Sequence, residues 1–495
     1  MKKIIITLSI FTLLFTACER IDYGDLNQDP YAPSEANIDA MMRGAMIAFA
    51  EQSGRLGYSN ASLYAQYQTQ ATYQSAQLYP HITGDWEANY VYVLNNLKTI
   101  NNTTSDVRGN TVNMQVIAEL TSVLAWKRIT DTFGDVPYFE ALQGASNPNP
   151  AYTSQRDIYV DLIARTKAAR DMIDPAAFTP DADTDIFYGG DMDKWGKFAN
   201  SMLLALTIQL SNTSEAVMAQ TEFQAALADA HGLIEVNADN IVFTPDTGGG
   251  MSNPISWQRG GDYSISKELT DALRGNAVWG PNGTDTKNPT STVGNNTDFR
   301  IFAYAESTTA DGLPYGYQTN IGLSGSIIDM PDYYDAASAP FTLFSAAYTW
   351  LNRAEGSLIY ATGENTNTMF TNGVVASFEL AETMSLPGGA GIASFGAAKA
   401  TERLADVAGS VTMAQVIGEE KWFALFPDGF AAWAEQRRTG FPALHPAPEA
   451  TNGGVIPHRM LYPSGESTLN PSGWSQGVQG LTPADDKNTS KIWWE

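Results

Sequence analysis

The sequence predicts a mainly α-helical protein, with a TPR-like scaffold of helical hairpins, a large irregular loop-rich insert and few short strands. Three observations support this fold class. Apolar residues recur at helical spacing along most of the chain, and strand patterns are few and short. Residues 244–340 are instead rich in turn formers, in stretches such as PDTGGGMSNP and GPNGTDTKNPTSTVGNN. The helices follow one another in pairs, although no clean 34-residue repeat is visible.

The part of the chain before the insert contains a series of helical patterns. Ser34 is a good cap for the first helix, whose apolar face carries Met42 and Met46. Gly134, followed closely by Pro137, ends the fourth helix. We expect helices over 34–57, 61–77, 84–104, 111–130, 154–174, 192–211 and 214–231, and a short strand around 241–244.

Helical patterns resume after the insert. Pro427 breaks one helix and Asp428 caps the next. Arg437 and Arg438 near the end of that next helix are placed to bond backbone carbonyls or acids rather than a ligand, so we interpret this stretch as structural. We expect helices over 341–361, 366–383, 411–426 and 429–438, followed by a loop-rich tail over 440–495.

The first residues, MKKIIITLSIFTLLFTAC, have the form of an export signal. Two lysines precede a largely apolar stretch that is too short to span a bilayer, and small residues directly before Cys18 resemble a bacterial lipobox. The alternative is an ordinary secretory signal with an incidental buried cysteine. We expect residues 1–17 to be a signal peptide, Cys18 to carry a lipid anchor, 18–33 to form a tether and 34–495 to form a single domain.

Composition excludes several classes of function. The chain has 29 basic and 54 acidic residues, a net charge of −25 that repels phosphate backbones, so we expect no nucleic-acid partner. One cysteine excludes disulfides within the chain and cysteine-based zinc sites. Four histidines leave little for a metal site or a catalytic triad. We therefore predict neither a metal nor another cofactor.

Signatures of catalysis are also missing. The sequence contains neither H-E-x-x-H nor G-x-S-x-G. Ser264 to Lys267 fits the S-x-x-K pattern of serine acyltransferases, but no K-T-G follows, and we interpret Ser264 as a helix cap. With so many acidic residues, composition does not exclude a catalytic pair of carboxylates as in glycosidases, but no particular pair is marked by the sequence. We predict a protein that is not an enzyme.

Aromatic residues beside turns provide the candidates for ligand contact. The segment 64–100 is unusually rich in Tyr, Gln and Asn, a mixture that suits neutral polar ligands because flat rings stack on sugar faces and amides bind hydroxyls. The alternative is that these rings pack helices or hold long loops to the helical body. The candidates are Trp86, Tyr73 and Tyr79 around the turn at 80–84, Trp257 and Trp279 in the insert, and Tyr263, Tyr315 and Tyr317 as weaker insert candidates.

Longer motifs carry a family resemblance over essentially the whole chain after Cys18. They include DTFGDVPYFEAL (131–142), DKWGKFANSMLLAL (193–206), LNRAEGSLIYATG (351–363), EEKWFALFPDGFAAWAEQRRTGFPAL (419–444) and IPHRMLYPSGESTLNPSGW (456–474). In this order behind a lipobox, they resemble the SusD/RagB family of outer-membrane nutrient-binding lipoproteins, in its second SusD-like branch. The one departure is Gly356, where the family often has alanine.

The resemblance implies a helical TPR-like scaffold whose irregular region carries the ligand face. It also implies a lipid-anchored, surface-exposed protein of the cell outer membrane that caps a SusC-type TonB-dependent transporter. Family ligands are mostly oligosaccharides, so an oligosaccharide-binding protein is the first hypothesis. A peptide-binding member of the family is the alternative, and a surface glycoside hydrolase is a third hypothesis of a different class.

Overall fold

The computed structural model describes residues 37–495, apart from positions 85, 107, 258–260, 276–297, 320–322, 324, 385–390 and 409–410. Asp39–Glu495 forms one compact unit. The predictions for the signal peptide, the tether, Cys18 and Trp279 lie outside the described residues. Within the described part of the chain, no helix is both long enough and apolar enough to cross a lipid bilayer.

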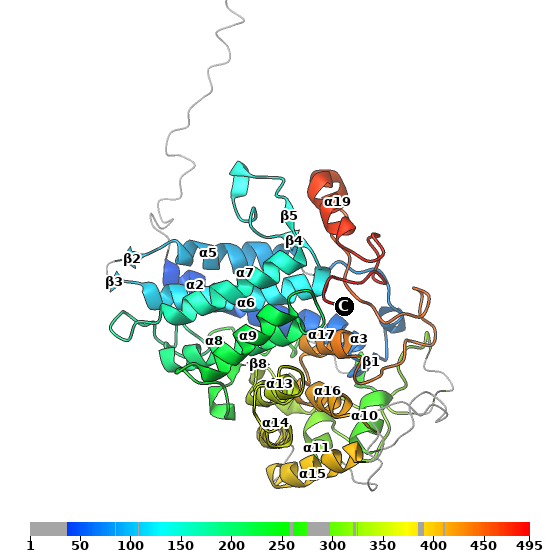
Figure 1. Cartoon of the computed structure of the whole chain (residues 1–495). Coiled ribbons are helices and arrows are strands. Elements are labelled where there is room, and N and C mark those ends of the chain that lie inside the picture. Colours follow the sequence, from blue (N-terminus) through cyan, green and yellow to red (C-terminus); the bar gives the residue numbers. More distant parts are fainter. Residues whose placement is uncertain are drawn as a thin grey trace, which may run out of the picture. The chain divides into compact units, whose positions relative to one another are not determined.

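Before the insert, successive helices pack on one another. Helix α5 lies against α6, α6 against α7, α7 against α8 and α8 against α9 (Figure 1). Helices α7 and α8 begin at the capping side chains of Ser154 and Asp191, each of which accepts a hydrogen bond from a backbone amide of the first turn. The bounds are α2 Ile38–Leu56, α4 Trp86–Ala88, the π-helical turn η4 Asn89–Leu94, α5 Asn95–Asn101, α6 Val112–Phe133, α7 Gln155–Asp171, α8 Met192–Gln209 and α9 Ala216–Ala228.

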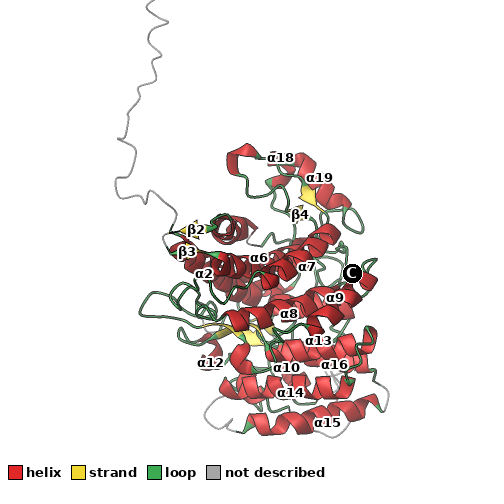
Figure 2. Ribbon diagram, turned by 60° about the vertical axis from the view of Figure 1, so that its left-hand side comes forward, coloured by secondary structure: helices red, strands yellow, loops and turns green. Residues whose placement is uncertain are grey.

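After the insert, a second group of helices continues the stack. Helix α13 packs on α8, α14 and α16, so it joins the two groups, and Figure 2 shows the layers following one another from α6 and α7 through α8 and α13 to α14 and α15. The bounds are α13 Ala346–Ile359, α14 Thr366–Thr383, α15 Gly396–Val407, α16 Met413–Ala424, α17 Gly429–Thr439, α18 Glu466–Leu469 and α19 Pro471–Gln479. The mainly α-helical, layered fold class is confirmed.

Strands are short and pair two by two in the described residues. The ladder of β6 (Ile241–Phe243) and β8 (Phe341–Phe344) brings together the two ends of the loop-rich insert. The ladder of β1 (Gln68–Gln70) and β7 (Tyr263–Ile265) ties the middle of the insert to the N-terminal part of the chain. The other pairs are β2 (Ser105–Asp106) with β3 (Gly109–Asn110) and β4 (Val136–Pro137) with β5 (Tyr152–Thr153).

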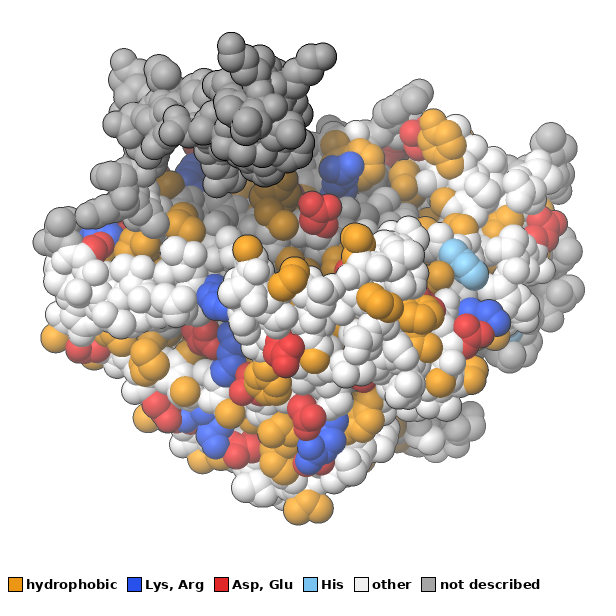
Figure 3. Space-filling view, turned by 90° about the horizontal axis from the view of Figure 1, so that it is seen from above, with side chains coloured by type: hydrophobic (Ala, Val, Ile, Leu, Met, Phe, Trp, Pro, Cys, Tyr) orange, Lys and Arg blue, Asp and Glu red, His pale blue; other side chains and the backbone are white. Residues whose placement is uncertain are grey.

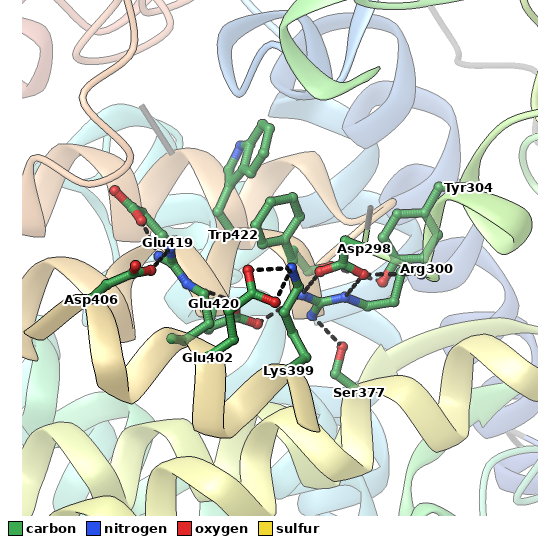
Figure 4. A network of polar contacts seen from close by, with 12 residues as sticks. Asp298, Arg300, Tyr304, Ser377, Lys399, Glu402, Asp406, Glu419, Glu420 and Trp422 are labelled. Atoms are coloured by element: carbon green, nitrogen blue, oxygen red, sulfur yellow. Dashed lines mark hydrogen bonds and ion pairs between the residues drawn. The ribbon is translucent and has the colours of Figure 1, made fainter. Parts of the chain in front are cut away.

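Buried charges hold the segment that resumes at Asp298 to the helical stack. The backbone amide of Asp298 donates to the carbonyl of Leu273 at 2.5 Å. Two residues on, fully buried Arg300 donates to Asp298, to Glu420 of α16 at 2.8 Å and to Ser377 of α14 at 3.0 Å (Figure 4). Removing one partner of a buried ion pair is costly because the other charge stays unpaired in a low-dielectric interior. This network therefore fixes where the segment re-enters the core.

The structural interpretation of the 421–440 stretch is confirmed. The carboxylate of Asp428 caps α17 by accepting hydrogen bonds from two backbone amides, and Gly440 ends the helix in the left-handed region. Arg437 donates to backbone carbonyls, among them that of Asp131 at 2.8 Å. Arg438 binds the carboxylate of Glu355 through both terminal nitrogens, at 2.7 and 2.8 Å. Both arginines are occupied in the core.

One predicted helix is wrong. Residues 61–77 form the end of a π-helical turn (η2, Gly57–Ala61), the single turn α3 (Ser62–Tyr64), strand β1 and the 3-10 turn η3 (Gln74–Gln77). Glutamine side chains explain the difference, because Gln70 and Gln77 bond backbone groups here and compete with a regular helix. The short helices α10 (Lys267–Leu273), α15 and α19 were not predicted.

Candidate ligand-binding site

Two of the predicted tyrosines, Tyr73 and Tyr263, come from segments that meet at the ladder of β1 and β7. Gln70 lies opposite Tyr263 in this ladder. The carbonyl oxygen of the Gln70 side chain accepts a hydrogen bond from the backbone amide of Tyr73 at 3.2 Å. Tyr73 follows the strand, and 55% of its surface is exposed. The ladder thus presents an open tyrosine ring next to a half-buried one.

Gln77 links these segments to the third tyrosine, Tyr317. Its side chain is fully buried, and its Oε1 accepts hydrogen bonds from Thr69 Oγ1 at 2.6 Å and from the amide of Gln70 at 2.9 Å. Its Nε2 donates to the carbonyl of Tyr317 at 3.0 Å. We call Tyr73, Tyr263 and Tyr317 the tyrosine face, because this one hydrogen-bonded frame carries all three.

The hydroxyl groups of Tyr263 and Tyr317 stay protonated at neutral pH. Burial raises the pKa of Tyr263 to about 12, and this effect outweighs that of a hydrogen bond with Gln70, which lowers the pKa. Burial also raises the pKa of Tyr317, and the nearby carboxylates of Glu268 and Glu449 raise it further by smaller amounts. A phenol in this state both donates and accepts hydrogen bonds, as do the hydroxyls of a sugar.

A buried carboxyl lies behind the tyrosine face. Glu268 in α10 accepts a hydrogen bond from the amide of Tyr315 at 3.3 Å, and its second oxygen has no hydrogen-bond partner among the described residues. Burial raises the pKa of Glu268 to about 7, so part of the population carries a proton at neutral pH.

Two predicted ligand contacts, Tyr79 and Tyr315, are corrected by the structure. Their exposed fractions are 0% and 2%, and their rings lie against each other. The hydroxyl of Tyr79 accepts a hydrogen bond from the amide of Ala447 at 2.9 Å, and its carbonyl accepts one from Asn488. Buried rings cannot stack on a sugar. Tyr79 instead pins the C-terminal loops to the body, and Tyr315 packs against it.

Trp86 lies in a different aromatic cluster. Its ring meets Phe133 edge to face at 5.0 Å, stacks on Tyr152 at 6.1 Å, and approaches Tyr90 and Tyr462. The residue is half-buried. Four ring neighbours give Trp86 a packing role, and ligand contact through its exposed part stays a prediction.

Trp257 lines a groove beside α2, away from the ladder of β1 and β7. Half of its surface is exposed. The groove has a volume of about 860 Å³ and is bounded by α2, by Tyr92 of η4 and by residues 250–257. Trp279, predicted with Trp257, lies outside the described residues, as do residues 258–260.

The serine of the S-x-x-K pattern has a structural role, although a different one from that predicted. Ser264 lies in β7, where its hydroxyl accepts a hydrogen bond from the amide of Ile328 at 2.9 Å. The cap of α10 is Ser266, which accepts from Leu269. Lys267 pairs with Asp271 at 2.8 Å. In the described residues, no group of three His, Cys, Asp or Glu side chains is placed to hold a metal ion.

Figure 3 shows one face of the molecule, on which charged side chains of both signs stand singly or in small mixed groups. The described residues form no large patch of one sign on this face. Two of the three segments that form the tyrosine face agree with this view, whereas Asp262 directly precedes Tyr263 in the third. Neither 70–77 nor 313–319 contains a charged residue. The arrangement of half-open rings, neutral amides and phenols is suited to a neutral polar ligand.

The comparison with protein families decides the identity of the fold. A SusD-like family described as "Starch-binding associating with outer membrane" matches residues 30–463. The chain belongs to the SusD-like family. SusD-like proteins are binding proteins associated with the outer membrane, and this membership supports a nutrient-binding role for the chain. Among curated proteins, none matches the chain.

Solved structures show the same SusD-like fold. A chitin-binding protein is 22% identical with a TM-score of 0.77, over 92% of this chain and 99% of that one. A chitin-binding SusD homologue from Flavobacterium johnsoniae is 21% identical with a TM-score of 0.69, over 92% and 97%. A SusD homologue from Bacteroides fragilis is 20% identical with a TM-score of 0.76, over 93% and 99%. At these identities the likeness shows the fold alone.

Sequence reasoning missed the residues that assemble this site. Gln70 and Gln77 are buried and carry the frame of the tyrosine face. A run of glutamines between aromatic residues was the available signal, but it was interpreted as ligand-binding amides on a helix. Tyr92, which faces the groove, was missed because its segment has a helical pattern with other apolar residues.

Proposed function

We propose that this SusD-like protein captures an oligosaccharide at the cell surface and delivers it to a SusC-type TonB-dependent transporter. The observation that supports the ligand class is the tyrosine face, with one open ring and two half-buried rings, of which Tyr73 and Tyr317 lie on uncharged segments. Rings of this kind stack on the CH-rich faces of sugars, and neutral phenols and amides bind hydroxyls without requiring a charge on the ligand.

Chitin oligomers are the first ligands to test. Two of the solved structures with this fold are described as chitin-binding proteins. N-acetylglucosamine units offer an uncharged sugar face and an amide, which matches the chemistry of the tyrosine face. The identity to those proteins is low, so this choice is a proposal about ligand class and extends to other neutral glycans.

The test is a calorimetric binding screen of the chain from Glu19 onward against chitin oligomers, maltohexaose and neutral peptides of similar length. We expect saturable binding of at least one glycan and none of the peptides. Binding of peptides alone would favour the peptide-capturing alternative. Steady release of shortened sugars, abolished by changing a single acidic residue, would favour a hydrolase and contradict the proposal.

Delivery to a transporter is a separate part of the proposal. It is supported by membership of a family associated with the outer membrane. The test is co-purification of a SusC-type transporter with the affinity-tagged full chain from detergent-solubilised outer membranes. A chain that is recovered without any TonB-dependent transporter would contradict this part and leave the glycan-binding part unaffected.

A further inference from the structure

We propose that the groove beside α2 is a second binding site for a neutral oligosaccharide, separate from the tyrosine face. The proposal rests on the proposed function, because it assigns the same ligand class to a second place on the chain. The tyrosine face and the groove share no described residue. They flank the two ends of the segment that runs from Trp257 to Tyr263.

Two open aromatic rings line this groove. Tyr92, from η4, is 60% exposed, and Trp257, from the loop that follows β6, is 50% exposed. Gly44 and Ala48 of α2 also line the groove, and their small size leaves room for a ligand. The volume of about 860 Å³ lies within the range of about 300–1,000 Å³ that is typical of ligand sites.

An unpaired amide gives the groove a second, independent mark of a ligand site. Gln52 lines the groove and is only 8% exposed, and its Oε1 has no hydrogen-bond partner in the described part of the chain. Buried polar atoms normally have a partner, because an unmet acceptor has lost its bonds to water without replacement. Turning the Gln52 amide toward the groove lets a sugar hydroxyl supply the missing donor.

The charges of the groove favour a neutral ligand over an ionic one. Glu51 and Arg55 both line it, so their formal charges cancel. The guanidinium of Arg55 lies over the Trp257 ring, 5.6 Å from its centroid, and so supports the ring from one side. Rings on the walls with an amide between them match a chain of sugar units, whose faces stack and whose edges hydrogen-bond.

The two sites can be told apart by hydrogen exchange of the full chain, measured by mass spectrometry with N-acetylchitohexaose, maltohexaose and, as a non-sugar probe, pentaalanine. We expect a hexasaccharide to slow exchange in peptides covering 44–56 and 250–257, in addition to those covering 68–77 and 313–319. Trp257→Ala should remove the protection of 44–56 and weaken binding at the groove at least about tenfold. It should leave the protection of 68–77 unchanged.

Two controls make the assignment specific. Val91 is exposed and adjacent to Tyr92 in the sequence, but it does not line the groove. Val91→Ala should therefore leave the protection of the groove as in the wild type. Tyr73→Ala should remove protection at 68–77 and leave that at 44–56. Because Trp257, Val91 and Tyr73 are all exposed, these variants are expected to fold.

The outcomes separate this inference from the proposed function. Glycan protection of the tyrosine face without the groove overturns the second site and keeps the function. Protection of the groove by pentaalanine but by neither hexasaccharide overturns the assignment of a sugar there. Absence of protection at both places with both hexasaccharides overturns the two proposals together.

Discussion

The side-chain amide of Gln77 donates a hydrogen bond at 3.0 Å to the backbone carbonyl of Tyr317, 240 residues further along the chain. The same side chain accepts from Thr69 and from the amide of Gln70. One buried residue therefore holds together the segments that carry Tyr73, Tyr263 and Tyr317. The geometry of the tyrosine face depends on this frame as much as on the rings themselves.

Replacing Gln77 by alanine should destabilise the protein and weaken ligand binding. The change leaves the buried amide of Gln70 without its acceptor and the carbonyl of Tyr317 without its donor, whereas Thr69 keeps its bond to Pro314. We expect a cost of about 3 kcal/mol in the free energy of unfolding. Urea denaturation measures this cost. Gln74→Ala is the matched control, because Gln74 makes a single hydrogen bond to its neighbour Ala71. Equal, small losses in the two variants would contradict the role assigned to Gln77.

Tyr73→Ala should lower glycan affinity at least about tenfold, because an exposed stacking ring contributes to binding and little to stability. The melting temperature should stay as in the wild type, since more than half of the side chain is in solvent. Titration calorimetry and thermal denaturation check the two expectations. Tyr73→Phe keeps the ring and should keep most of the affinity. An alanine variant with wild-type affinity would move the ligand away from the tyrosine face.

Trp86→Ala should act mainly on stability. The ring has four aromatic neighbours and is half-buried, so its removal should cost about 2–3 kcal/mol in the free energy of unfolding. Denaturant unfolding gives this value, and glycan titration of the folded variant shows whether affinity also changes. Unchanged stability together with lost affinity would instead make Trp86 a ligand contact.

Glu268 should make the protein less stable as the pH rises from about 4.5 to about 7. Its pKa is raised from 4.5 to about 7 in the folded chain, so in this window the unfolded chain releases the proton while the folded chain keeps it. The loss should reach about 3 kcal/mol. Glu268→Gln removes the titration. The unfolding free energy of the variant minus that of the wild type should therefore increase as the pH rises over this window. A constant difference would show that the carboxyl ionises normally.

Cys18→Ala should leave a folded protein in the soluble fraction, because Cys18 is the only cysteine and the proposed site of lipid attachment. Fractionation of cells that lack the partner transporter checks this expectation, since the transporter could otherwise retain the protein. Ser9→Ala, in the same leader, is the control and should leave the protein in the membrane fraction. Retention of Cys18→Ala in washed outer membranes would contradict the lipid anchor.

Long periodic helices were predictable from the sequence because their apolar spacing is local information. The prediction of 366–383 agrees with α14, and that of 111–130 agrees with α6 within three residues at its end. The predicted helix over 61–77 failed because tertiary hydrogen bonds decide its structure. Gln70 and Gln77 find their partners partly in segments far away in the sequence, which no local pattern can reveal.

The candidate site was predictable in kind but not in arrangement. Composition indicated rings and amides for a neutral ligand, and Tyr73 and Trp257 are indeed open to solvent. Whether a given tyrosine is open depends on what the long loops cover. Tyr79 and Tyr315 have the same local surroundings of turn formers as Tyr73, yet the loop that contains Ala447 folds over Tyr79.

The hydrogen bond between Asp298 and Leu273 has a consequence for how this protein can diverge. The two ends of the intervening stretch meet at one point, and Arg300 anchors that point in the core. Closing a longer loop costs only about 0.6 kcal/mol for each doubling of its length. A change in the number of residues between Leu273 and Asp298 therefore leaves this anchored point in place. The same property makes the position a natural graft site, at which foreign recognition sequences can be installed without redesigning the helices.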